Sequence, residues 1–152
     1  MNEFNNLVSE VEITYINKIP SSERVKISNS EDCVSVFKSI SRYNLNLPLY
    51  ECFYAMYINR ATKVLSVMLI SEGGTCGTFV DIKKVLAPAI LQNASGIILS
   101  HNHPSGNTEP SESDRDLTNR IVKSASLMGI KILDHVILTE ESFYSFADNG
   151  LI

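Results

Sequence analysis

One short apolar run, Gly96 to Ser100, constrains the fold more than any other stretch. Its residues are continuously apolar rather than alternating, which is typical of a strand buried on both faces of a sheet. After a polar loop, apolar residues recur at the spacing of one helix face: Leu117, Ile121, Ala125 and Met128. Gly129 is well placed to end that helix. A buried strand followed by a helix predicts an α/β fold with a mixed β-sheet packed with helices.

The remaining elements follow from local patterns. Residues 52–58 and 63–70 are rich in aromatic and β-branched residues and flank a turn, so they predict a β-hairpin. Ser30 can cap a helix that ends near residues 43–46, before Pro48. Asp81 begins a second helical pattern, which Pro88 is expected to kink or to divide into two pieces. Further short extended segments are expected at 12–16, 78–80, 130–139 and 143–146.

The length of 152 residues suits a single domain. We divide this domain, residues 1–152, into an N-terminal strand, loop and helix (1–46) and a core that bears the polar motif (47–152). No domain boundary is expected in the polar stretch 17–30, because the segment before it is too short to hold a core of its own.

Composition argues against several classes of protein. The net charge is −4, and basic residues are scattered with no cluster beyond Lys83-Lys84, so direct nucleic-acid binding is not supported, although a basic face formed by folding would escape this test. No apolar run approaches the roughly 18 residues of a membrane span, and the N-terminus does not resemble a signal peptide, so a cytoplasmic protein is expected. Cys33, Cys52 and Cys76 are odd in number and form no CxxC, which favours free thiols.

The polar stretch after the buried run contains two of the three histidines, His101 and His103. Residues i and i+2 of an extended chain point to the same side, so both imidazoles would face one point while Asn102 turns away. Pro104 and Gly106 bend the chain, which lets Asp114 return to that point. Imidazole nitrogen and carboxylate oxygen both suit Zn²⁺, and three protein ligands leave a fourth position for water. Alternatively, each histidine is a polar residue at a strand edge.

Asp114 has a structural interpretation as well. Ser111 is a good helix N-cap, and Asp114 three residues later would complete a capping box. The two interpretations are compatible in part, because a cap that fixes the start of the helix also lets the first turn present the carboxylate. Glu109, in the loop, is a further but unconstrained candidate ligand.

The spacing His-x-His, seven residues, Ser, two residues, Asp resembles the JAMM motif of JAB/MPN-domain metalloproteases. The longer string His-Asn-His-Pro-Ser-Gly at 101–106, with Pro110-Ser111 and Asp114, is similar to the RadC branch of that family, as are Leu133-Asp134-His135 and Tyr144-Ser145-Phe146. The resemblance covers Leu47 to the C-terminus. It implies a JAB/MPN-like (cytidine-deaminase-like) fold without the N-terminal helix-hairpin-helix module of long RadC proteins.

The resemblance also implies roles for individual residues. His101, His103 and Asp114 would bind Zn²⁺, Glu51 would act as general acid/base, and Ser111 would stabilise the oxyanion. Without the resemblance, Glu72 competes with Glu51 for the acid/base role. His135 is open to two interpretations, either support for the metal ligands from behind or a hydrogen-bonded core histidine.

These roles imply a zinc-dependent hydrolase that cleaves a peptide or isopeptide bond of an unknown peptide or protein substrate. Two alternatives stay open: a DNA-processing protein, since RadC-type proteins are traditionally labelled as DNA repair, and a non-catalytic metal-binding scaffold. A zinc nucleobase deaminase is not indicated, because it would need His-x-Glu with Cys-x-x-Cys. The substrate and the oligomeric state do not follow from the sequence.

Overall fold

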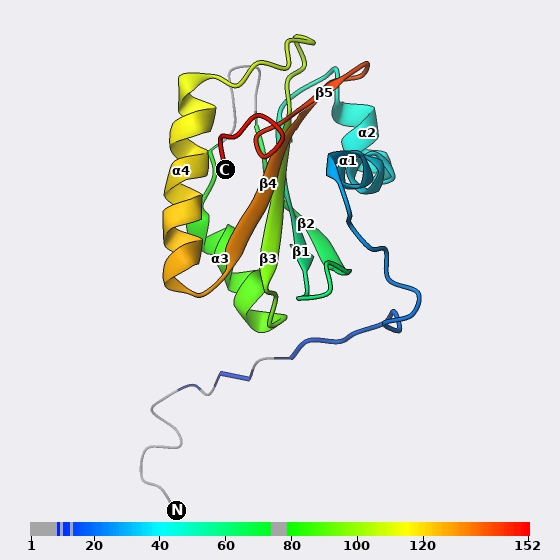
Figure 1. The fold of residues 1–152 in the computed structure, drawn as a ribbon, viewed down its shortest axis with the longest axis vertical. Coiled ribbons are helices and arrows are strands. Elements are labelled where there is room, and N and C mark those ends of the chain that lie inside the picture. The colour runs from blue at the N-terminus through cyan, green and yellow to red at the C-terminus, as the bar shows by residue number, and fades with distance from the viewer. Residues whose placement is uncertain (1–8, 10, 13, 74–78) are drawn as a thin grey trace, which may run out of the picture.

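The computed structural model describes residues 9, 11–12, 14–73 and 79–152. It contains one five-stranded sheet in the order β2-β1-β3-β4-β5 (Figure 1). The strands are β1 (Cys52–Ile58), β2 (Val64–Glu72), β3 (Gly96–Asn102), β4 (Lys131–Leu138) and β5 (Phe143–Ser145). The helices are α1 (Ser30–Lys38), α2 (Ser41–Asn46), α3 (Ile82–Leu91) and α4 (Glu112–Leu127). The fold is therefore a single-domain, mixed α/β fold, as the sequence predicts.

Strand β3 occupies the centre of the sheet and joins its two halves. It pairs antiparallel with β1 on one side and parallel with β4 on the other. The parallel pairing requires a crossover, which α4 supplies between β3 and β4. Strands β1 and β2 form the expected antiparallel hairpin. Every residue of β3 is buried, which confirms the interpretation of the apolar run.

Helices cover both faces of the sheet (Figure 1). On one face, Phe53, Ala55 and Tyr57 of β1 pack with apolar residues of β3, α3 and α4. On the other face, the intervening residues of β1 pack with apolar side chains of α1 and α2. This alternation means that odd-numbered residues of β3 point to the α3/α4 face, whereas even-numbered ones point to the α1/α2 face. The two faces carry different parts of the site.

Helix α4 begins and ends at the residues that the sequence indicates. The Ser111 side chain accepts a hydrogen bond from the Asp114 N–H, and the Asp114 side chain accepts one from the Ser111 N–H, so the capping box is complete. The helix stops at Leu127, and Gly129 then adopts a positive φ of 68°. Glycine adopts that backbone conformation without the strain that a Cβ would introduce.

Two predictions about the elements are wrong. Among the described residues of 12–16 there is no strand, because Val11 and Ile16 lie 87% and 71% exposed with no neighbouring strand to bury them. The helix expected from Ser30 to 43–46 is two helices, and its N-cap is Asn29 rather than Ser30. Ser39 donates its hydroxyl to the Val36 carbonyl and Ile40 is extended, so the first helix ends there.

Of the two outcomes expected at Pro88, a kink or a division of the helix, the division does not occur. α3 runs continuously from Ile82 to Leu91. Proline at that position removes the donor to the carbonyl of Lys84, and Lys84 is exposed, so water can take the place of the missing donor. Thr78, expected in an extended segment, and Cys76 lie outside the described residues. None of the helices in the described part of the chain is both long and apolar enough to cross a membrane.

Candidate metal centre

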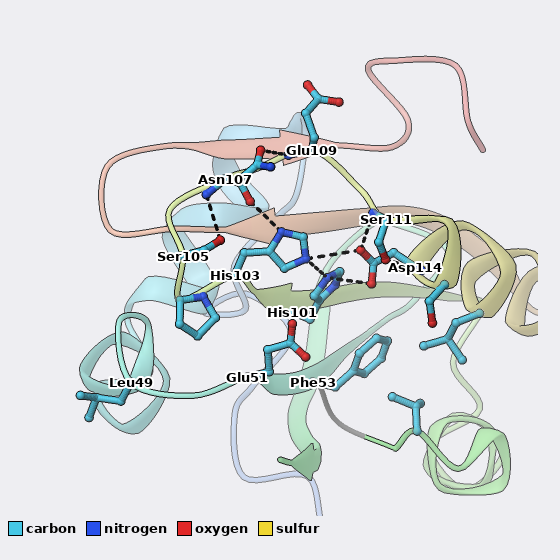
Figure 2. A pocket seen from close by; sticks show the side chains of 14 residues that line it. Leu49, Glu51, Phe53, His101, His103, Ser105, Asn107, Glu109, Ser111 and Asp114 are labelled. Atoms are coloured by element: carbon cyan, nitrogen blue, oxygen red, sulfur yellow. Dashed lines mark hydrogen bonds and ion pairs between the residues drawn. The ribbon is translucent and has the colours of Figure 1, made fainter. Parts of the chain in front are cut away.

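His101 and His103 lie at the end of β3 and just after it, and both point to the α4 side (Figure 2). Asn102, between them, points to the opposite face, as the alternation predicts. The Nε2 atoms of the two histidines are 3.0 Å apart. His101 is buried and His103 is half-buried, so one imidazole belongs to the core and the other to the rim of a cavity.

Asp114 joins the two histidines from the first turn of α4. Its Oδ1 lies 3.3 Å from His101 Nε2, and its Oδ2 lies 3.3 Å from His103 Nε2. The same Oδ2 accepts the Ser111 N–H at 2.8 Å. Capping of the helix and metal binding by Asp114 are therefore compatible, because the capping hydrogen bond fixes the carboxylate where it faces both imidazoles.

The donor atoms fit a tetrahedral zinc site. One ligand atom from each of His101, His103 and Asp114 lies within 4.8 Å of the others, and the closest separations are 3.0, 3.3 and 3.3 Å. With zinc–ligand distances of about 2.0–2.1 Å, neighbouring ligand atoms of a tetrahedral site lie about 3.3 Å apart. The nature of the metal does not follow from these distances, but the donor set is one that zinc accepts.

Charge also favours a cation at this point. Burial acts to raise the pKa of Asp114, but hydrogen bonds to His101 and His103 outweigh it and hold that pKa well below its usual range. The hydrogen bond to Asp114 raises the pKa of His103 above its usual value. The ionised carboxylate thus holds positive charge between itself and the imidazoles, and a metal ion would compete with a proton for that position.

A cavity of about 560 Å³ opens over the three candidate ligands. Glu51 lines this cavity from the residue before β1, and its carboxylate points toward His101 (Figure 2). Its negative charge adds to the factors that raise the pKa of His103. Ser111 also lines the cavity; its hydroxyl oxygen accepts from the Asp114 N–H, and no hydrogen bond among the described residues engages its proton. Glu109 lies on the cavity wall but points away from the histidines.

Glu72, the alternative to Glu51 for the acid/base role, is engaged in contacts outside the cavity. Its carboxylate lies 2.6 Å from the Arg42 guanidinium and also accepts from the Asn46 amide. It is not among the residues that line the cavity. The geometry therefore favours Glu51 for any role in this cavity, while that role stays a prediction.

Two residues behind the ligands were not assigned a role from sequence. Asn102 is fully buried, and its side-chain nitrogen donates to the carbonyls of Leu47 and Tyr50, just before β1. Thr118, one turn after Asp114 in α4, contacts His135 of β4. His135 in turn contacts His101, so it lies directly behind a candidate ligand. Burial lowers the pKa of His135 well below its usual value, with the charge of His101 acting in the same direction.

The fold and the three-ligand site define a protein of the JAB/MPN class. The family model described as "RadC-like JAB domain" matches residues 27–151, and the chain belongs to this family. It is 39% identical to a UPF0758 protein of Flavobacterium johnsoniae over 83% of this chain and 53% of that protein. It is 37% identical to a UPF0758 protein of Porphyromonas gingivalis over 89% and 60%, and 36% identical to UPF0758 protein YfjY of Escherichia coli over 67% and 64%. The chain thus spans about half to three-fifths of the first two of these relatives.

Proposed function

We propose that this chain is a zinc-dependent hydrolase that cleaves an amide bond in a peptide or isopeptide substrate. The observation that carries this proposal is the convergence of His101, His103 and Asp114 in one cavity with the carboxylate of Glu51. Zinc held by three protein ligands lowers the pKa of water to roughly 7 and polarises a carbonyl. The family relationship supports the same class of chemistry.

The roles of the chain's own residues follow from their positions. Glu51 accepts a proton from the attacking water and passes it to the leaving amine. Ser111 has its hydroxyl oxygen fixed by the Asp114 N–H, so its proton is available to the oxyanion that develops on the carbonyl. Asp114 and the two histidines hold the zinc. Apart from the candidate ligand Asp114, Glu51 has the only carboxylate of the described cavity wall that points toward the histidines.

The charge of the cavity supports a peptide rather than a nucleic acid as substrate. Its described lining includes three carboxylates, those of Glu51, Glu109 and Asp114, and no lysine or arginine. A phosphodiester backbone is bound by basic side chains, and an acidic wall repels it. Apolar side chains also reach the cavity: Leu49, Phe53, Val80 and Leu117. These provide contact surface for a peptide side chain.

Zinc content tests the first half of the proposal. We expect about one zinc per chain in protein purified without chelators, as in other three-ligand sites. His101→Ala and Asp114→Ala should each remove it, since either change leaves two protein ligands. Elemental analysis measures the content. A wild-type protein without bound metal, which also fails to take up added zinc, would contradict the proposal.

A side-by-side activity screen tests the second half. Zinc-loaded protein is incubated with a peptide library, isopeptide-linked substrates and DNA, with the Glu51→Gln variant as control. We expect cleavage of an amide bond by the wild type and no cleavage by the variant. Cleavage of DNA without cleavage of peptides would instead assign the site to nucleic-acid processing. Zinc binding without any cleavage would favour the scaffold.

A further inference from the structure

A line of buried hydrogen bonds runs behind the candidate metal ligands. His101 Nδ1 lies 2.7 Å from His135 Nε2, and His135 Nδ1 lies 2.7 Å from Thr118 Oγ1. Thr118 Oγ1 donates to the backbone carbonyl of Asp114 at 2.6 Å. His101, His135 and Thr118 are 4%, 0% and 1% exposed, so water does not substitute for these partners. The line starts and ends at residues of the metal centre.

The direction of every hydrogen bond in this line is fixed by its last member. The carbonyl of Asp114 can only accept, so the single proton of the Thr118 hydroxyl is committed to it. Thr118 Oγ1 must then accept from His135, which places the proton of His135 on Nδ1. The ring of His135 is fully buried and has no carboxylate partner among the described hydrogen bonds, so it keeps a single proton and its Nε2 accepts from Nδ1–H of His101. Nε2 of His101 then faces Asp114 and His103: it can donate to the Asp114 carboxylate in metal-free protein, and its lone pair is what it offers to a metal ion.

The second histidine obtains the same orientation by a shorter route. His103 Nδ1 lies 2.7 Å from the carbonyl of Asn107, which can only accept, so Nδ1 of His103 carries a proton. Its Nε2 is the atom directed at His101 and Asp114. The two histidines thus reach the same orientation in different ways: a loop carbonyl orients the half-buried His103, and a line of hydrogen bonds orients the buried His101.

We propose that Thr118 and His135 are positioning residues that hold His101 in the Nδ1–H tautomer, so that its Nε2 lone pair is available to a metal ion. The proposal rests on the metal site of the proposed function and adds the device that orients one of its ligands. Residues that hydrogen-bond to metal-bound histidines raise metal affinity by about 10- to 100-fold. Because the line begins at a backbone carbonyl, the protons on Thr118 Oγ1 and on His135 Nδ1 are placed without any charged group.

Thr118→Val separates this role from simple packing, since valine has nearly the same shape and lacks the hydroxyl. In the variant, the Nδ1–H of His135 would be a buried donor without an acceptor, which is costly. The proton then moves to Nε2 of His135, which donates to Nδ1 of His101. His101 is forced into the Nε2–H tautomer, and its proton occupies the position of the metal.

The tautomers can be read directly in metal-free protein. Long-range ¹⁵N–¹H correlation spectra at pH 8 distinguish Nδ1–H from Nε2–H imidazoles for each histidine. We expect a proton on Nδ1 of both His101 and His135 in the wild type and in Thr118→Ser, and the loss of both Nδ1 protons in Thr118→Val. A wild-type His101 without a proton on Nδ1, or a Thr118→Val spectrum in which both Nδ1 protons remain, would overturn the proposal.

Zinc affinity supplies the second measurement, by competition with a chromophoric chelator. Thr118→Val should weaken zinc binding by about 10-fold or more, and Thr118→Ser by less than about 3-fold. Ile121→Val is the packing control, because it changes a buried apolar side chain on α4 without removing a hydrogen-bonding group. Equal losses in Thr118→Val and Ile121→Val would assign the effect to packing and refute the positioning role.

The two measurements also separate this proposal from the proposed function. If the wild type binds no zinc, the metal centre is wrong, and the spectra still decide whether Thr118 sets the tautomer of His101. If the wild type binds zinc and cleaves no substrate, the affinities decide the positioning role independently of catalysis. Should Thr118→Val fail to fold, the wild-type tautomer and the comparison with Thr118→Ser still provide the test.

Discussion

The side-chain Oδ1 of Asn102 accepts a hydrogen bond from the backbone N–H of Cys52 at 2.8 Å. The amide nitrogen of the same side chain donates to the carbonyls of Leu47 and Tyr50, each at 3.0 Å. These contacts enclose the segment that carries Glu51. The residue between the two histidines therefore fixes the backbone of the candidate acid/base from the opposite face of the sheet.

Asn102→Ala is expected to destabilise the fold by about 3 kcal/mol, because it leaves several buried backbone groups without partners at about 1–3 kcal/mol each. Zinc binding should persist, since both histidines keep their strand, whereas hydrolysis should fall as Glu51 loses its support. Urea unfolding and zinc titration measure the two effects. A loss of stability below about 1 kcal/mol would show that water replaces the amide.

Asp114 can be changed so that its two functions separate. Asp114→Asn keeps an oxygen that can accept the Ser111 N–H but removes the charge, so we expect helix α4 to keep its start and zinc affinity to fall steeply. Asp114→Ala should lose zinc and also cost about 1 kcal/mol of stability through the missing cap. Thermal unfolding of the metal-free variants compares the caps, and chelator competition compares the affinities. Equal stability of both variants would mean that the capping box contributes little.

Glu51→Gln is expected to retain zinc and to lower the rate of hydrolysis by about 10²- to 10⁴-fold, the usual contribution of a general acid/base. Glutamine keeps the size of the side chain and removes its ability to take a proton. Glu72→Gln is the matched control on the neighbouring strand and should leave the rate close to that of the wild type. Steady-state kinetics on the same substrate make the comparison. The reverse ranking of the two variants would move the acid/base role to Glu72.

The buried thiols should be inert. Burial raises the pKa of Cys33 to about 12, with Asp134 acting in the same direction, so at pH 8 only about one thiol in 10⁴ is ionised. Burial likewise raises the pKa of Cys52. In a Cys76→Ser background, we expect no rapid reaction with a disulfide reagent at pH 8 and two thiols in denaturant. Fast labelling of the native protein would indicate local opening around α1 or β1.

Much of the site was predictable because it depends on local signals. The end of β3, the spacing of His101 and His103, and the capping box at Ser111 all lie within fifteen residues of sequence. The first strand expected at 12–16 was wrong because alternation cannot supply a partner strand. Glu51 and Glu72 could not be separated from sequence periodicity, since the decisive fact is the distant Arg42 that engages Glu72.

The supporting residues were harder to find for a related reason. Thr118 contacts His135 across 17 residues of sequence, through the parallel pairing of β3 with β4 that α4 makes possible. One signal was present: Asp114 and Thr118 are four residues apart and therefore share a face of the helix. That spacing alone is common in helices and becomes informative only once His135 is placed beside it.

The double use of the Asp114 carboxylate has a thermodynamic consequence. Any fluctuation that unfolds the first turn of α4 also moves the candidate metal ligand Asp114 away from the histidines. Unfolding of this turn and release of the metal are therefore thermodynamically coupled. Reciprocity then requires that a bound ion strengthen this turn by the same factor by which an intact turn strengthens the hold on the ion. Hydrogen exchange at the N-terminal amides of α4 should consequently slow when metal binds. The exchange rate of these amides would then report how much of the protein holds a metal ion.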